Sequence, residues 1–103
     1  MSLEGKRILI SRTDSIGDVL LTLPICSWLK EKHLKSSILF LGNTYTSPIV
    51  DLYSFVDSFV NWDDFSSLSK KEKLKKWKEL DIDIIIHVFP NKKIAQLAKK
   101  AKT

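Results

Sequence analysis

The sequence has little of what usually marks secreted, membrane or metal-binding proteins. Its 103 residues include one cysteine, three glycines and three prolines. No apolar run approaches the ~18 to 20 residues of a membrane-spanning helix. The single Cys26 excludes an internal disulfide and a structural zinc site, which favours a reducing, cytoplasmic compartment. The composition is close to that of average globular proteins, which excludes collagen-like and disordered chains. A length of 103 residues with 44% hydrophobic content indicates one small globular domain.

The N-terminus, from Met1 to Gly5, lacks the apolar core of a secretory signal. We interpret residues 1–5 as a prefix added for expression and assign residues 6–103 to the domain. No internal repeat or low-complexity linker divides that part of the chain, so we expect a single folding unit.

Positive charge is concentrated in the second half of the chain. Residues 1–67 carry six Lys and Arg against eight Asp and Glu, whereas residues 68–103 carry eleven Lys against four acids. Such asymmetry is typical of an anionic partner or of solvated, lysine-rich helix faces. The lysine-rich helix pattern has Trp77 on its apolar side and no aromatic residues interleaved on its basic face, and it matches no known nucleic-acid-binding motif, so we expect no nucleic acid as a partner. Peripheral attraction of segment 70–102 to an anionic membrane surface stays open.

Apolar runs alternate with helical patterns along the chain. Runs without polar alternation, typical of strands buried on both faces, predict strands over 7–11, 37–42, 57–61 and 82–88. Helical spacing predicts helices over 18–33, 45–53, 68–80 and beyond Asn91. Pro24 predicts a kink or a break in the first helix. The apolar positions that we expect on its buried face are Val19, Leu20, Leu23, Trp28 and Leu29.

This element order predicts an α/β fold: a Rossmann-like parallel sheet of strand order 3-2-1-4 with helices on both faces and right-handed crossovers. The fourth strand would then be an edge, although Asp83-Ile-Ile-Ile-His87 is hydrophobic enough for a central strand. Further strands or a partner usually cover such an edge. We therefore expect the chain to be a truncated part of a longer protein.

Ligands bind open parallel sheets at the carboxyl ends of the strands, where the strand order reverses. In this order the loops Arg12–Gly17 and Phe89–Lys93 leave the two strands at that point. The first loop is not G-x-G-x-x-G and lacks a P-loop lysine, which disfavours a dinucleotide site. It places Asp18 at a helix N-terminus, behind a glycine that frees the turn. Asp18 is either a plain first-turn acid that meets the helix dipole or a functional carboxylate.

Other polar residues carry weaker signals. We expect Asp14 to structure its loop and Arg12 to bind an anion or to anchor that loop. His87 is expected to be buried or bonded to the loop, with ligand binding as the alternative. Two separated histidines and one cysteine form no metal cluster, so no metal site is predicted. Cys26 is expected in the core.

One continuous segment resembles a known family. The run Arg7-Ile-Leu-Ile-Ser-Arg-Thr-Asp-Ser-Ile-Gly-Asp-Val-Leu-Leu-Thr-Leu-Pro24 is similar to the N-terminal signature of the lipopolysaccharide heptosyltransferases, glycosyltransferase family 9. That signature is a hydrophobic strand, then Lys/Arg-Thr-x-Ser-x-Gly-Asp, then an apolar helix start that ends in Thr/Ala-Leu-Pro. Many members have a histidine where Leu21 stands.

The resemblance implies a GT-B glycosyltransferase, of which this chain would be part of the N-terminal, acceptor-side domain. The donor, ADP-heptose, would bind a C-terminal domain that this chain lacks, and no cofactor is implied. The reaction would be an inverting, metal-independent transfer of heptose to a lipopolysaccharide inner-core acceptor of the lipid A/Kdo type. The family works in the cytoplasm, at the inner face of the inner membrane. We expect this part alone to be inactive.

The resemblance also assigns roles to residues. Asp18 would be the catalytic base that takes the proton of the acceptor hydroxyl. The acceptor-binding residues would be Arg12, Thr13, Ser15, Gly17, Lys92 and Lys93. The alternative is a stand-alone Rossmann-like module that binds a phosphorylated small molecule or a protein partner. A transferase needs the Asp18 side chain in the open crevice, whereas a binding module tolerates it bonded to local backbone amides.

Overall fold

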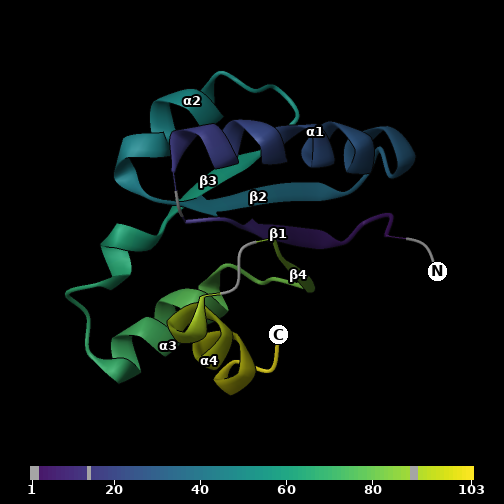
Figure 1. Cartoon of the computed structure of the whole chain (residues 1–103). Helices are drawn as coiled ribbons and strands as arrows, with labels where there is room; N and C mark the ends of the chain where they lie inside the picture. The colour runs from purple at the N-terminus through teal and green to yellow at the C-terminus, as the bar shows by residue number, and fades with distance from the viewer. Residues whose placement is uncertain (1–2, 14, 89–90) are drawn as a thin grey trace.

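A computed structural model describes residues 3–13, 15–88 and 91–103. These residues form a central sheet with helices on both of its faces (Figure 1). The strands are β1 (Arg7–Ser11), β2 (Ser37–Gly42), β3 (Ser58–Asn61) and β4 (Ile84–His87). The α-helices are α1 (Ile16–Lys32), α2 (Ser47–Asp51), α3 (Lys70–Glu79) and α4 (Lys92–Lys100). Two short 3-10 helices are η1 (Thr44–Thr46) and η2 (Trp62–Phe65).

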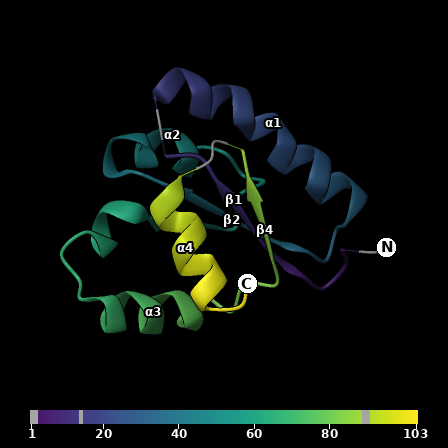
Figure 2. The ribbon, with the colours of Figure 1, turned by 60° about the horizontal axis from the view of Figure 1, so that its bottom comes forward.

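The sheet confirms the predicted fold class. All pairings are parallel, and the order is β3-β2-β1-β4. Because β1 lies between β2 and β4, its residues Ile8, Leu9 and Ile10 have no exposed surface. Helices α1 and α2 cover one face of the sheet, and α3 and α4 cover the other (Figures 1 and 2).

Alternate strand residues contribute to two hydrophobic cores, one on each face. Ile8 and Ile10 pack with the α1 and α2 side, whereas Leu9 packs with the α3 and α4 side. The same alternation separates Ile38 from Leu39 in β2. Strands that are apolar at successive positions are therefore required, because both directions lead into a core.

Helix α1 differs from its prediction in three respects. It begins at Ile16, so Gly17 belongs to its first turn and not to the preceding loop. It continues without a break through Pro24. Leu20 and Trp28, which we expected to be buried, are 49% and 56% exposed. Apolar residues occupy most of the helix surface, so periodicity alone could not select the face formed by Val19, Thr22, Leu23, Cys26 and Leu29.

Three further boundaries are corrected. Strand β4 is shorter than the predicted 82–88, and its residues Ile84–Ile86 are half-buried because the strand is an edge with a single neighbour, β1, as the predicted strand order implies. The helix predicted over 45–53 begins only at Ser47, after η1, and Thr46 is the N-cap of α2. The predicted loop after β3 contains the 3-10 helix η2, where the Asn61 side chain accepts a hydrogen bond from the Asp63 N–H at 3.0 Å.

Two contacts outside the regular elements support the core on the α1 side of the sheet. Leu3, within the segment that we interpreted as a prefix, packs against the core on the α1 side. Asp57 Oδ2 accepts hydrogen bonds from the Ile38 N–H at 2.7 Å and from Lys30 Nζ at 2.9 Å. Although burial raises the pKa of Asp57, these two donors and the charge of Lys30 hold it below its ordinary value.

Candidate functional site

The candidate site lies at the carboxyl ends of β1 and β4. Ser11 pairs with His87, and the Val88 N–H donates a hydrogen bond to the Ser11 carbonyl oxygen at 3.1 Å. From these neighbouring strand ends the chain leads to α1 on one face and to α4 on the other (Figure 2). Both helix N-termini therefore lie at the same edge of the sheet. The buried Ser11 Oγ has no hydrogen-bond partner among the described residues.

Asp18 lies in the first turn of α1, held by two neighbours. Ser15 is the N-cap, and its Oγ accepts from the Asp18 N–H at 3.4 Å. The same hydroxyl donates to Asp18 Oδ2 at 2.7 Å, while Arg12 Nη2 lies 3.3 Å from Asp18 Oδ1. The Asp18 side chain is nevertheless 44% exposed, whereas that of Arg12 is 17% exposed. The carboxylate is thus oriented by its neighbours and still open to a ligand.

The loop before α1 is attached to the end of β2. The Arg12 N–H donates to the Leu41 carbonyl oxygen at 3.1 Å, and Asn43 Nδ2 donates to the Thr13 carbonyl oxygen at 2.6 Å. Thr13 therefore contributes its backbone to the shape of the site. Asp14, expected to structure this loop, lies outside the described residues. Asn43 was not identified from the sequence, and its one available signal is its position directly after β2.

The backbone of α1 does not require a glycine at position 17. A Cβ atom at this position would meet no atom within 4 Å, so the surface above it is open. Glycine here leaves room for a ligand to approach the backbone closely. Because Gly17 has no positive φ, its backbone conformation does not require glycine, unlike the prediction that this glycine frees the turn before the helix.

The lysines of the predicted site belong to the first turn of α4. Asn91 caps this helix, since its Oδ1 accepts hydrogen bonds from the Lys93 and Ile94 N–H groups at 3.0 and 3.2 Å. Lys92 and Lys93 are exposed at the positive end of the helix dipole, where cations are disfavoured. This helix start therefore combines backbone and side-chain positive charge, which suits an anion. Phe89, the predicted start of this loop, lies outside the described residues.

His87 ends β4 at this edge. Its side chain is exposed, so the expectation that it is buried is wrong. The physical reason is the edge position of β4, which leaves one side of the strand uncovered. His87 is therefore accessible to a ligand bound at the strand ends.

A groove on the α3 and α4 face was not predicted. It has a volume of about 210 Å³ and is lined by Trp62, Lys70, Lys73, Lys93, Gln96, Leu97 and Lys100. It shares Lys93 with the predicted site, and its other lining residues come from η2, α3 and α4. A helical spacing of 93, 96 and 100 was the available sequence signal, since it places three polar side chains on one face.

Two further features of the described residues bear on the kind of site. Within the described ranges, no three His, Cys, Asp or Glu side chains come together as a group that could hold a metal ion. Of the helices that the structure describes, none has the length and apolar character needed to cross a membrane.

The class of protein that the fold and the strand-end site define is a Rossmann-like α/β protein. No protein-family model and no curated protein matches the sequence. The chain is similar to the crystal structure of a glycosyl transferase family 9 protein from Veillonella parvula DSM 2008, with a TM-score of 0.80 and 24% sequence identity. The similarity covers 97% of this chain and 30% of that protein. At this identity it establishes the fold, and the chain spans less than a third of its neighbour.

Proposed function

We propose that this chain is the acceptor-side part of a glycosyltransferase of the family 9 type. The observation that carries the proposal is the oriented, solvent-accessible Asp18 at the strand-end site of a fold similar to that of a family 9 protein. The donor would be ADP-heptose, bound by a second domain, and the acceptor a lipopolysaccharide inner-core saccharide. The likeness of the Arg7–Pro24 segment to the heptosyltransferase signature supports these finer assignments.

In the proposed reaction Asp18 removes the proton from the acceptor hydroxyl as its oxygen attacks the anomeric carbon of the sugar. The bond to the nucleoside diphosphate breaks on the opposite face, which inverts the configuration. Arg12 and Ser15 engage different oxygens of the carboxylate, and so hold it in one orientation. Lys92 and Lys93 would bind acidic groups of the acceptor as charge-assisted donors.

A stand-alone binding module is the second candidate. The observation in its favour is that both Asp18 oxygens already have local partners, as expected for a carboxylate with a structural role. In that case the Lys92 and Arg12 side chains would hold a phosphorylated small molecule without any transfer. The two candidates differ in which ligand the strand-end site accepts.

We expect an NMR titration with a soluble phosphorylated Kdo glycoside to shift the amide signals of Ser15 to Asp18 and of Lys92. ADP should leave these signals unchanged, because the donor belongs to another domain. Lys92→Gln should weaken binding of the glycoside about tenfold by removing one charge-assisted contact. Lys99→Gln, which removes the same charge from the far end of α4, is the matched control and should change the affinity less than about twofold.

Shifts caused by ADP at these amides would contradict the acceptor-side assignment. A phosphorylated small molecule without a Kdo group that shifts these same strand-end amides, and binds there as well as the glycoside, would favour the binding module. Equal effects of Lys92→Gln and Lys99→Gln would mean that net charge, and not the strand-end site, attracts the ligand.

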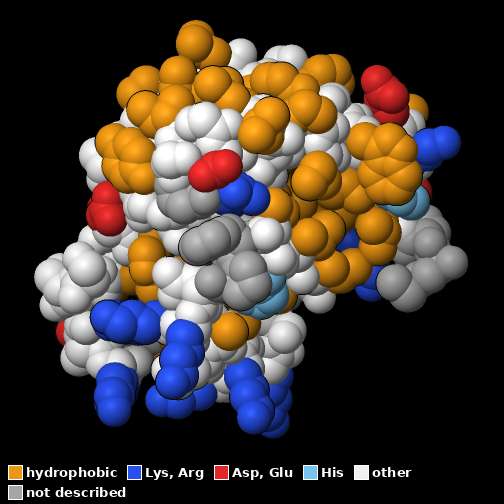
Figure 3. Space-filling model, viewed as in Figure 1, with side chains coloured by type: hydrophobic (Ala, Val, Ile, Leu, Met, Phe, Trp, Pro, Cys, Tyr) orange, Lys and Arg blue, Asp and Glu red, His pale blue; other side chains and the backbone are white. Residues whose placement is uncertain are grey.

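We further propose peripheral association of the lysine-rich segment 70–102 with an anionic membrane. Lys and Arg side chains gather over the α3 and α4 side, opposite a hydrophobic region over α1 and α2 (Figure 3). Each basic residue near an anionic surface contributes about 1 kcal/mol. In a sedimentation assay at low salt, the chain should pellet with phosphatidylglycerol-containing vesicles and be released by high salt. Equal partition into phosphatidylcholine vesicles would contradict this proposal.

A further inference from the structure

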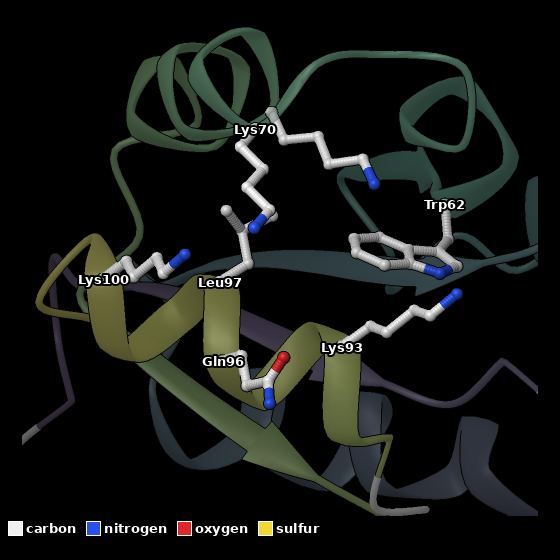
Figure 4. Close-up of a pocket in the computed structure, with 7 residues that line it drawn as sticks. Trp62, Lys70, Lys93, Gln96, Leu97 and Lys100 are labelled. Carbon is white, nitrogen blue, oxygen red and sulfur yellow. The ribbon is translucent and has the colours of Figure 1, made fainter.

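We propose that the groove between α3 and α4 binds a phosphorylated saccharide. Its wall residues come from three separate segments: Trp62 from η2, Lys70 and Lys73 from α3, and a row of residues from α4. Figure 4 shows the Trp62 indole beside the Lys93 side chain at one end of the groove and Lys100 at the other. The groove extends beyond the proposed transfer site, because Lys93 is the one proposed acceptor-binding residue among its lining residues and neither Arg12 nor Asp18 lines it.

Trp62 has a fixed orientation. Its indole stacks on the Phe65 ring, with centroids 5.1 Å apart and planes inclined by 23°. Phe65 in turn packs edge-on against Trp77 at 6.3 Å, and both of these rings are buried. Trp62 therefore presents to the groove a preorganised aromatic surface, which needs little ordering when a ligand binds. The apolar C–H face of a pyranose ring is complementary to such a surface.

The charge of the groove selects an anion. Four of its seven lining residues are lysines, and none is an acid. Lysines that line one groove repel one another, and a bound phosphate reduces that repulsion through charge-assisted hydrogen bonds. Lys93 and Lys100 are seven residues apart on α4, so their Cα atoms are separated by about 10 Å. This length accommodates an anionic group at each end of one sugar.

The remaining lining residues fit the sugar itself. Gln96 lies on α4 between the two lysines, where its amide can both donate and accept hydrogen bonds with hydroxyl groups (Figure 4). Leu97 supplies an apolar contact. The volume of about 210 Å³ is below that of pockets for drug-sized ligands, about 300–1,000 Å³. A single phosphorylated sugar ring therefore suits the groove better than a dinucleotide.

The test is isothermal titration calorimetry of the 103-residue chain with glucose 1,6-bisphosphate. Glucose has the sugar ring without the phosphates, and inorganic phosphate has the anion without the ring. Each should bind at least about tenfold more weakly than the bisphosphate. The double variant Lys73→Gln/Lys100→Gln should weaken bisphosphate binding about tenfold or more. The matched control is Lys71→Gln/Lys99→Gln, which removes the same charge from exposed positions of the same helices and should have less than about a twofold effect.

Trp62→Ala should also weaken binding of the bisphosphate, while binding of inorganic phosphate stays unchanged. Equal losses in the two lysine double variants would overturn the proposal, as would inorganic phosphate binding as tightly as the bisphosphate. Anionic vesicles that bind in a groove-dependent manner, without any binding of the soluble bisphosphate, would overturn it in favour of a lipid surface. These variants leave Arg12, Asp18 and Lys92 unchanged, and also Lys93, which the groove shares with the strand-end site, so the strand-end titration tests the proposed function separately.

Discussion

Trp77→Ala should lower the free energy of unfolding by about 3–5 kcal/mol, as expected for truncation of a fully packed aromatic residue. Trp77 is 1% exposed and is the largest side chain of the core between the sheet and helices α3 and α4. Its ring supports Phe65, and its Nε1–H donates to Thr103 Oγ1 at 3.0 Å. Because a domain of this size is stable by only about 5–15 kcal/mol, this loss removes a large part of its stability.

Urea unfolding followed by circular dichroism measures this loss, and Trp28→Ala is the matched control. Trp28 is 56% exposed on α1, so its truncation should cost no more than about 1 kcal/mol. Trp77→Phe should retain most of the packing and lose about 1 kcal/mol with the hydrogen bond to Thr103. Similar losses for Trp77→Ala and Trp28→Ala would mean that the α3 and α4 side contributes little to the stability of the fold.

The contrast between these two tryptophans shows how far the sequence could predict the fold. The parallel sheet and its order follow from apolar runs separated by helices, and the structure confirms both. Trp77 lies on a narrow apolar stripe of a lysine-rich helix, so its burial was predictable. Trp28 lies on a helix that is apolar nearly all round, and only packing against β1, β2 and α2 selects the buried face.

In the candidate site, too, local features were predictable from the sequence and long-range contacts were not. The sequence placed Arg12, Ser15 and Asp18 in one loop and helix start, but their contacts with one another were not predicted and come from the structure. The bond from Asn43 to Thr13 joins residues 30 positions apart, and no local pattern indicates it. The groove depends on how η2, α3 and α4 pack together, which a lysine pattern within one helix does not determine.

Cys26 should react with a disulfide reagent such as DTNB about a thousandfold more slowly in the folded chain than in urea. The thiol is buried in the core between α1 and the sheet, and burial raises its pKa from 9.0 to about 12. With a pKa difference of this size, the folded chain has about a thousandth of the thiolate of the unfolded chain at any pH below the pKa of the unfolded thiol. A cysteine introduced by Glu31→Cys into a Cys26→Ala chain is the control, because position 31 is exposed on the same helix and should react rapidly.

The same shift in pKa predicts how stability depends on alkaline pH. The folded chain keeps the Cys26 proton up to a pH of about 12, whereas the unfolded chain loses it near 9.0. Between these two pH values the unfolded state therefore binds fewer protons than the folded state. The contribution of the Cys26 thiol to the free energy of unfolding is complete below pH 9.0 and is lost as the pH rises toward 12. Urea midpoints of the native chain should fall more steeply over this interval than those of Cys26→Ala. Parallel pH profiles, together with rapid labelling of Cys26 in the folded chain, would mean that α1 does not seal this thiol within the core.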